Sequence, residues 1–139
     1  MVGIEITPLQ ILAPVGIGLV YIILSSFARE PARQTFSAIV VAGAGSAYFA
    51  GGFGPLELAF STVMLWVAFK GSKYYYFIGI GWLLHTAWDV AHHLYGNPII
   101  PFAPTSSFGC AICDPVLAIW FFLGAPSVFD FKKKKPVTT

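Results

Sequence analysis

The sequence predicts an all-α integral membrane protein, a polytopic bundle of five transmembrane helices. Three observations support this prediction. Of the 139 residues, 57% are hydrophobic and only 10% are charged, against about 25% charged in an average soluble domain. The mean hydropathy of +0.76 implies more apolar surface than one small core hides. The lysines and arginines fall in three short groups, and the apolar stretches between them approach the roughly 20 residues that cross a bilayer.

The predicted spans are 8–28, 33–50, 55–70, 74–95 and 111–130, which form a single transmembrane domain over residues 1–139. The first, third and fifth spans each end at a basic group: Arg29 with Arg33, Lys70 with Lys73, and the lysines at 132–135. Basic residues collect on the cytoplasmic side of membranes. The pattern therefore predicts an N-out, C-in topology.

Local signals mark the limits of these spans. Pro8 stands at the start of the first span, and Glu30-Pro31 separates it from the second. Residues 51–55, with the sequence GGFGP, predict a tight turn before the third span. Asp114-Pro115 resembles an N-cap followed by proline at the first helical position, so the fifth span is expected to begin there.

All three histidines, both cysteines and three of the six acidic residues fall toward the side that this topology makes extracytoplasmic. Glu57 opens the third span, Asp89 and the three histidines lie in the fourth, and Cys110, Cys113 and Asp114 open the fifth. Ionisable groups in apolar helices face the interior of a bundle and mark functional sites. This convergence is the main functional indication in the sequence.

The fourth span carries a polar stripe. At about 100° per residue, His85, Asp89 and His92 fall within about 60° of one another. Imidazole and carboxylate at i, i+3 and i, i+4 spacing are typical ligands of zinc and iron. His85 and His92 are about 10 Å apart along the axis, so a single ion needs a ligand from another span. The candidate ligands are His85, Asp89, His92, His93, Cys110, Cys113 and Asp114, and the candidate acid–base groups are His85, Asp89 and Glu57.

Two alternatives to a metal site remain open. The same groups can form a hydrogen-bond network without any ion. The Cys110-Ala111-Ile112-Cys113 motif can form a redox disulfide, supply two soft metal ligands, or place two small residues in a packed helix. The chain has only these two cysteines, so it lacks the second pair through which a membrane thiol oxidoreductase normally relays electrons.

Four stretches of the second half carry a family resemblance: 85–93, 95–98, 110–115 and 124–127. In these stretches the chain resembles a family of small bacterial integral membrane proteins of unknown function. The resemblance is clearest over residues 80–128 and extends to the first half only in its hydrophobic outline. It implies that the two polar segments belong together and that the protein lies in the bacterial inner (cytoplasmic) membrane. It implies no reaction or cofactor.

The sequence therefore favours a small membrane protein with a site for a divalent transition metal, zinc or iron. A metal-dependent enzyme that acts on a lipid-soluble substrate is one form of this hypothesis. A non-catalytic accessory subunit of a larger membrane complex and a CxxC or haem redox module are the alternatives. Expected partners are membrane lipids, with a second copy of the chain or other membrane proteins as further candidates. The low content of basic residues excludes a nucleic-acid-binding surface.

Overall fold

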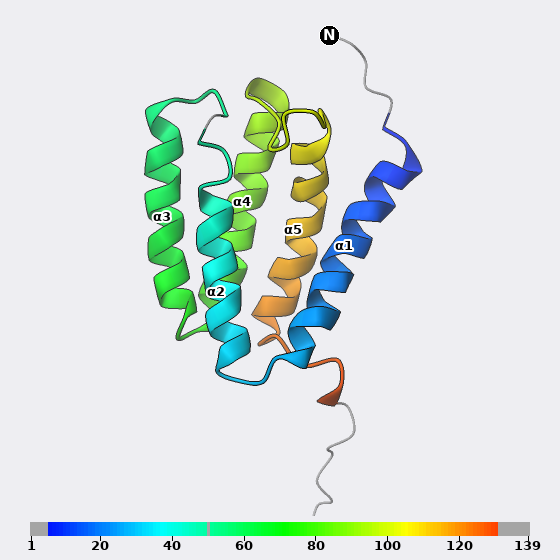
Figure 1. Ribbon diagram of the computed structural model, residues 1–139, viewed down its shortest axis with the longest axis vertical. Coiled ribbons are helices and arrows are strands. Elements are labelled where there is room, and N and C mark those ends of the chain that lie inside the picture. The colour runs from blue at the N-terminus through cyan, green and yellow to red at the C-terminus, as the bar shows by residue number, and fades with distance from the viewer. Residues whose placement is uncertain (1–5, 50, 131–139) are drawn as a thin grey trace, which may run out of the picture.

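The structure is a computed structural model that describes residues 6–49 and 51–130. The described residues form five helices: α1 (Pro8–Phe27), α2 (Ala32–Gly45), α3 (Pro55–Gly71), α4 (Tyr75–Tyr95) and α5 (Ser106–Phe122). Within this part of the chain, the only β-type pairing is an isolated bridge between Ile100 and Ala103. The predicted all-α fold is thus confirmed (Figure 1).

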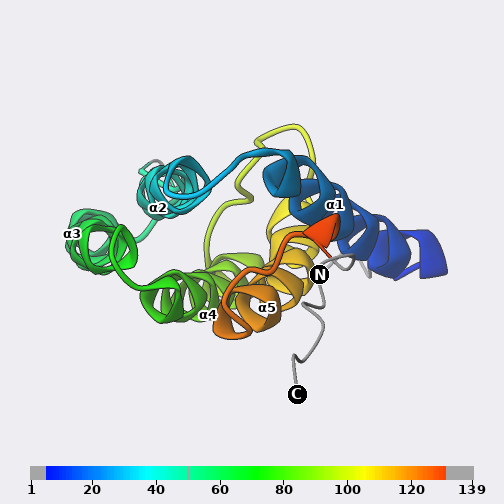
Figure 2. The ribbon, with the colours of Figure 1, turned by 90° about the horizontal axis from the view of Figure 1, so that it is seen from below.

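The helices run alternately up and down, so the connections gather at the two ends of the bundle (Figure 1). The α2–α3 and α4–α5 connections share one end, and the α1–α2 and α3–α4 connections share the other. The most extensive contact is between α4 and α5, and α2 packs on α3. α1 lies at the edge of the bundle and packs mainly against α5 (Figure 2).

The prediction of five membrane spans is wrong. Among the described residues, only α1 is both long and apolar enough to cross a membrane. It has 20 residues, and the mean hydropathy of its most apolar 18-residue stretch is 1.9. α2, α3 and α5 have only 14, 17 and 17 residues. α4 has 21 residues, but its three histidines and one aspartate lower its hydropathy.

The N-out, C-in topology depended on the five spans and is withdrawn with them. A single apolar helix does not by itself define a membrane protein, because a core helix or a signal sequence meets the same criteria. The lysines at 132–135, which were expected to end the fifth span, lie outside the described residues.

The helix starts show which local signals hold. α1 begins at Pro8, where Thr7 and Gln10 form a capping box. α3 begins at Pro55, after Gly54 with φ of 59°, a left-handed conformation that suits glycine. The predicted start of the last helix near Asp114-Pro115 is wrong, because α5 begins at Ser106 and carries Pro115 in its interior. Asp114 therefore lies two turns into α5, where its carboxylate contacts another helix instead of capping its own.

The core joins α2, α3, α4 and α5. Val41, Met64, Ile78 and Phe121 are each at most 1% exposed, and burying such a side chain stabilises a fold by about 1.5–3 kcal/mol. Gly45 allows close approach of α2 to α3, because a Cβ at this position would lie 2.3 Å from the Cβ of Met64. The last turn of α2 also contacts the middle of α4, where the carbonyl oxygen of Ala44 lies 3.0 Å from Nε2 of His85.

Candidate metal centre

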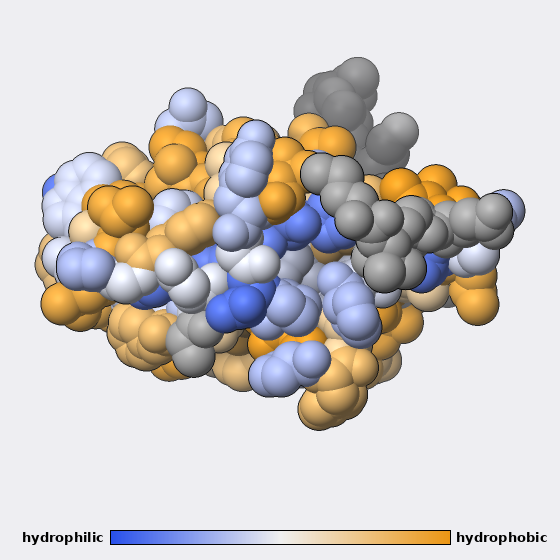
Figure 3. All heavy atoms as spheres, turned by 90° about the horizontal axis from the view of Figure 1, so that it is seen from above, coloured by the Kyte–Doolittle hydropathy of each residue, from blue (hydrophilic) through white to orange (hydrophobic). Residues whose placement is uncertain are grey.

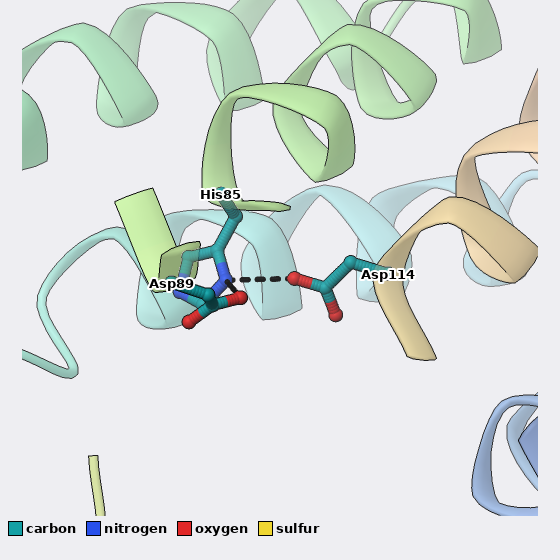
Figure 4. A group of neighbouring side chains, drawn as sticks. All are labelled: His85, Asp89 and Asp114. Carbon is teal, nitrogen blue, oxygen red and sulfur yellow. Dashed lines mark hydrogen bonds and ion pairs between the residues drawn. The ribbon is translucent and has the colours of Figure 1, made fainter. Parts of the chain in front are cut away.

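A buried group of three side chains lies between α4 and α5. His85, Asp89 and Asp114 are 2%, 0% and 3% exposed. The Nδ1 atom of His85 lies 3.0 Å from Oδ2 of Asp89 and 2.8 Å from Oδ2 of Asp114 (Figure 4). One ligand atom from each residue lies within 4.8 Å of the other two. Within residues 6–49 and 51–130, this is the only such group of histidine, cysteine and acidic side chains.

A backbone carbonyl fixes the orientation of His85. Its Nε2 lies 3.0 Å from the carbonyl oxygen of Ala44 at the end of α2. Because a carbonyl oxygen only accepts, Nε2 carries the hydrogen and donates it. Nδ1 is left to face the two carboxylates. A ring nitrogen that donates to a carbonyl or carboxylate while the other nitrogen faces the site is the usual arrangement of a metal-binding histidine.

The two aspartates favour a positive charge on His85. Burial alone would lower the pKa of His85, but hydrogen bonds and charge interactions with Asp114 and Asp89 outweigh it and raise the pKa to about 10. Burial raises the pKa of Asp114 to about 7, although the His85 hydrogen bond opposes this change. At neutral pH, a proton on Nδ1 therefore occupies the place where a metal ion would bind.

Tyr48 holds the second oxygen of Asp89. Its hydroxyl donates to Oδ1 of Asp89 at 2.6 Å, and the residue is only 2% exposed. Burial raises the pKa of Tyr48, and the neighbouring Asp89 carboxylate raises it further, so the hydroxyl stays protonated. Sequence reasoning missed Tyr48. Tyrosine is seldom a metal ligand, so its residue type did not mark it as a site residue. The only signal in the sequence was its position directly after the small residues at 42–47.

His92 belongs to a separate pair with Glu57. Its Nε2 lies 3.0 Å from Oε1 of Glu57, and its Nδ1 donates to the Trp88 carbonyl at 2.9 Å. The backbone N–H of Phe53 donates to the same Glu57 oxygen at 3.1 Å. The other oxygen, Oε2, is buried and has no hydrogen-bond partner among the described residues. Gly51 covers the pair closely, because a Cβ there would lie 2.4 Å from Nε2 of His92.

Tyr48 stands between the pair and the three-residue group. Its ring stacks on that of His92 with centroids 3.8 Å apart, while its hydroxyl bonds Asp89. The pair is therefore not part of the candidate ligand group but is in contact with it through one side chain.

The remaining predicted ligands lie outside the three-residue group. The His93 ring packs 5.3 Å from that of Phe108. Cys110 and Cys113 are free, half-buried thiols. Burial, followed by the charges of the two aspartates, raises the pKa of Cys110 to about 12 and that of Cys113 to about 11. A redox-active CxxC motif requires the opposite change, so this environment disfavours a redox module.

Comparison with known proteins places the chain in a family. A family profile described as a family of unknown function (DUF6010) matches residues 9–127. The chain belongs to the DUF6010 family. The match includes the first half of this DUF6010 protein, beyond the resemblance seen at residues 80–128, and it contains every residue of the candidate site. The family description names neither a bacterial source nor a membrane. No curated protein and no solved structure matches the chain.

A cavity of about 310 Å³ opens beside the site in this DUF6010 protein. It is lined by Ala47, Tyr48, Gly51, Asn97, Pro98, Ile99 and Pro101. Tyr48 therefore faces the cavity on one side and Asp89 on the other. Figure 3 views this end of the bundle, where hydrophilic side chains gather in the middle and hydrophobic ones surround them. None of His85, Asp89 and Asp114 lines the cavity, so Tyr48 connects it to the three-residue group.

Proposed function

We propose that this DUF6010 protein binds a divalent transition-metal ion, zinc or iron(II), through His85, Asp89 and Asp114. The observation that carries the proposal is the orientation of His85, with Nε2–H fixed by Ala44 and Nδ1 facing two buried carboxylates. Ligand distances near 2.0 Å place the donors of a tetrahedral zinc site about 3.3 Å apart. Nδ1 of His85 lies 3.0 Å from Oδ2 of Asp89 and 2.8 Å from Oδ2 of Asp114, so binding requires only small side-chain movements.

The donor set supports a catalytic role for the ion. Three protein ligands leave one or more coordination positions open, whereas structural zinc sites are closed by four. When bound, such an ion supplies Lewis acidity and lowers the pKa of a coordinated water. Tyr48 would keep Asp89 in a fixed orientation, and Glu57 with His92 would accept or return a proton. The cavity beside Tyr48 would admit the substrate.

We further propose that the protein works at a membrane, the inner membrane if its source is bacterial, with α1 as its anchor and a lipid-soluble molecule as its substrate. Only 22% of the apolar 18-residue stretch of α1 is buried inside the protein, which is a low fraction for a core helix. Its large outward side chains include Leu9, Leu12 and Leu24, which are 72%, 66% and 62% exposed. Alkaline extraction of cell membranes tests this: the chain should stay in the pellet, and release into the supernatant would contradict an anchored protein.

Metal titration of the chelator-treated protein tests the metal site. Calorimetry with zinc, and with iron(II) under anaerobic conditions, should show one site per chain. Asp114→Asn should weaken binding by at least about a hundredfold, because loss of even an orienting partner costs 10–100-fold. His93→Ala removes an imidazole of the same helix outside the group and should leave binding unchanged. If neither metal binds, or if Asp114→Asn binds as well as wild type, the three residues form only a polar packing network.

A further inference from the structure

A second cavity lies at the opposite end of the bundle, where α1 ends. It measures about 410 Å³ and is lined by Ser26, Phe27, Ala28, Arg29, Glu30, Arg33, Ser127, Phe129 and Asp130. Figure 2 views this end and shows the segment after α5 lying beside the connection from α1 to α2. The hydroxyl of Ser127 donates to the carbonyl oxygen of Ser26 at 3.1 Å. This bond holds the two sides of the cavity together.

Arg33 is the unusual residue of this cavity. It is only 7% exposed, and its Nε donates to Oε1 of Glu30 at 2.9 Å. Its Nη1 is buried and has no hydrogen-bond partner among the described residues. Leaving a donor of a charged group without a partner costs more than leaving a neutral one. One edge of the guanidinium is thus satisfied by Glu30, and its terminal nitrogen still requires an acceptor.

The surroundings favour an oxyanion as that acceptor. Arg29 brings a second positive charge and forms no ion pair with any described residue. Arg33 also lies in the first turn of the 14-residue helix α2, whose N-terminus attracts anions. Glu30 is engaged by Arg33 and by the hydroxyl of Tyr75. Glu30 and Asp130 are the two lining carboxylates; Glu30 is paired with Arg33, and Asp130 opposes an anion beside Arg29.

We propose that this cavity is a phosphate-binding site, in which the terminal nitrogens of Arg33, together with Arg29, bind the phosphate oxygens. Planar guanidinium groups match the geometry of phosphate and bind it with paired hydrogen bonds. The phosphate is either a free ion or the headgroup of a lipid. The position at the end of the apolar helix α1 is compatible with a headgroup at a membrane surface. The proposal does not depend on the metal centre.

Two probes distinguish the sources of phosphate. Calorimetry of the full chain with inorganic phosphate detects the free ion, and co-sedimentation with phosphatidylglycerol vesicles, compared with phosphatidylcholine vesicles, detects a headgroup. Arg33→Gln should weaken binding of the effective probe by at least about tenfold. Asp130→Asn should strengthen it, because it removes the opposing charge. Lys73→Gln removes an exposed positive charge at the same end of the bundle, outside the cavity, and should have little effect.

If Arg33→Gln does not fold, variants at the exposed residues Arg29 and Asp130 still test the proposal. Arg29→Gln should then weaken binding and Asp130→Asn should strengthen it. The proposal is overturned if wild type binds neither probe. It is also overturned if Lys73→Gln weakens binding as much as the arginine variants, since that result indicates attraction by net charge alone.

Discussion

Replacing Asp114 with asparagine is expected to stabilise the metal-free protein above pH 7 while it weakens metal binding. Two buried carboxylates share the single Nδ1–H of His85, and burial raises the pKa of Asp114 from 3.8 to about 7. Because the folded-state pKa lies above the unfolded value, Asp114 contributes stability that is fully present below about pH 4 and is lost as the pH rises through about 7. Asparagine resembles the neutral carboxyl group and does not titrate.

The size of the effect follows from the same change in pKa. A rise from 3.8 to about 7 corresponds to at most about 4 kcal/mol of stability lost by wild type at high pH. Asp114→Asn avoids this loss, because asparagine does not titrate. The amide fits beside His85 less well than a carboxyl group, and one imperfect buried hydrogen bond costs about 1–2 kcal/mol. Asp114→Asn should therefore match wild type within about 1–2 kcal/mol at pH 5 and exceed it by about 2 kcal/mol at pH 8.

Denaturant unfolding in chelator-containing buffer at pH 5 and pH 8 measures this difference. Asp130→Asn makes the same chemical change at an exposed position and should shift the free energy of unfolding by less than about 0.5 kcal/mol. If Asp114→Asn is less stable than wild type at pH 8, the ionised Asp114 stabilises the fold. The argument for a site that requires an added cation would then be wrong.

Three further predictions concern the neighbours of the site. The affinity for zinc should rise between pH 6 and pH 8, because a raised pKa of about 10 at His85 makes protons compete with the ion; calorimetry at both values checks this, and equal affinities would contradict it. Tyr48→Phe should destabilise the fold by about 1–3 kcal/mol, because Asp89 loses a buried hydrogen bond. Tyr74→Phe, at a residue that is 61% exposed, should leave the stability unchanged. Thermal unfolding of the two variants tests this difference. The pKa values of Cys110 and Cys113 are raised to about 12 and about 11. Both thiols should therefore react with iodoacetamide at pH 8 far more slowly than free cysteine does. Reaction at the rate of free cysteine would show that they are not held in the protonated form.

The local parts of the site could be predicted from the sequence. His85 and Asp89 are four residues apart, so helical periodicity alone places them on one face. The expectation that polar residues of different helices converge was sufficient to include Asp114. His92 could not be assigned in this way. It shares the stripe but lies almost two turns beyond His85, where Glu57 of α3 meets it, and that contact depends on tertiary packing.

Two other features had no signal in residue type. The carbonyl of Ala44 orients His85, and every residue of the chain has a carbonyl. Tyr48 follows α2 in the chain and contacts Asp89 of α4, a contact that depends on tertiary packing. The error in the fold had a similar origin. The mean hydropathy of the whole chain describes total apolar content, whereas spanning a membrane depends on the length and polarity of each helix, and the structure divides the chain into mostly shorter or more polar helices.

Elemental analysis of protein purified without a histidine tag or chelator tests the metal site most directly. Wild type should contain close to one equivalent of zinc or iron per chain, and His85→Ala and Asp89→Ala, each of which removes a proposed ligand, should contain almost none. His93→Ala should retain the wild-type content. A folded wild-type protein that contains no metal, or variants that retain the wild-type content, would contradict the assignment of His85, Asp89 and Asp114 as a metal centre.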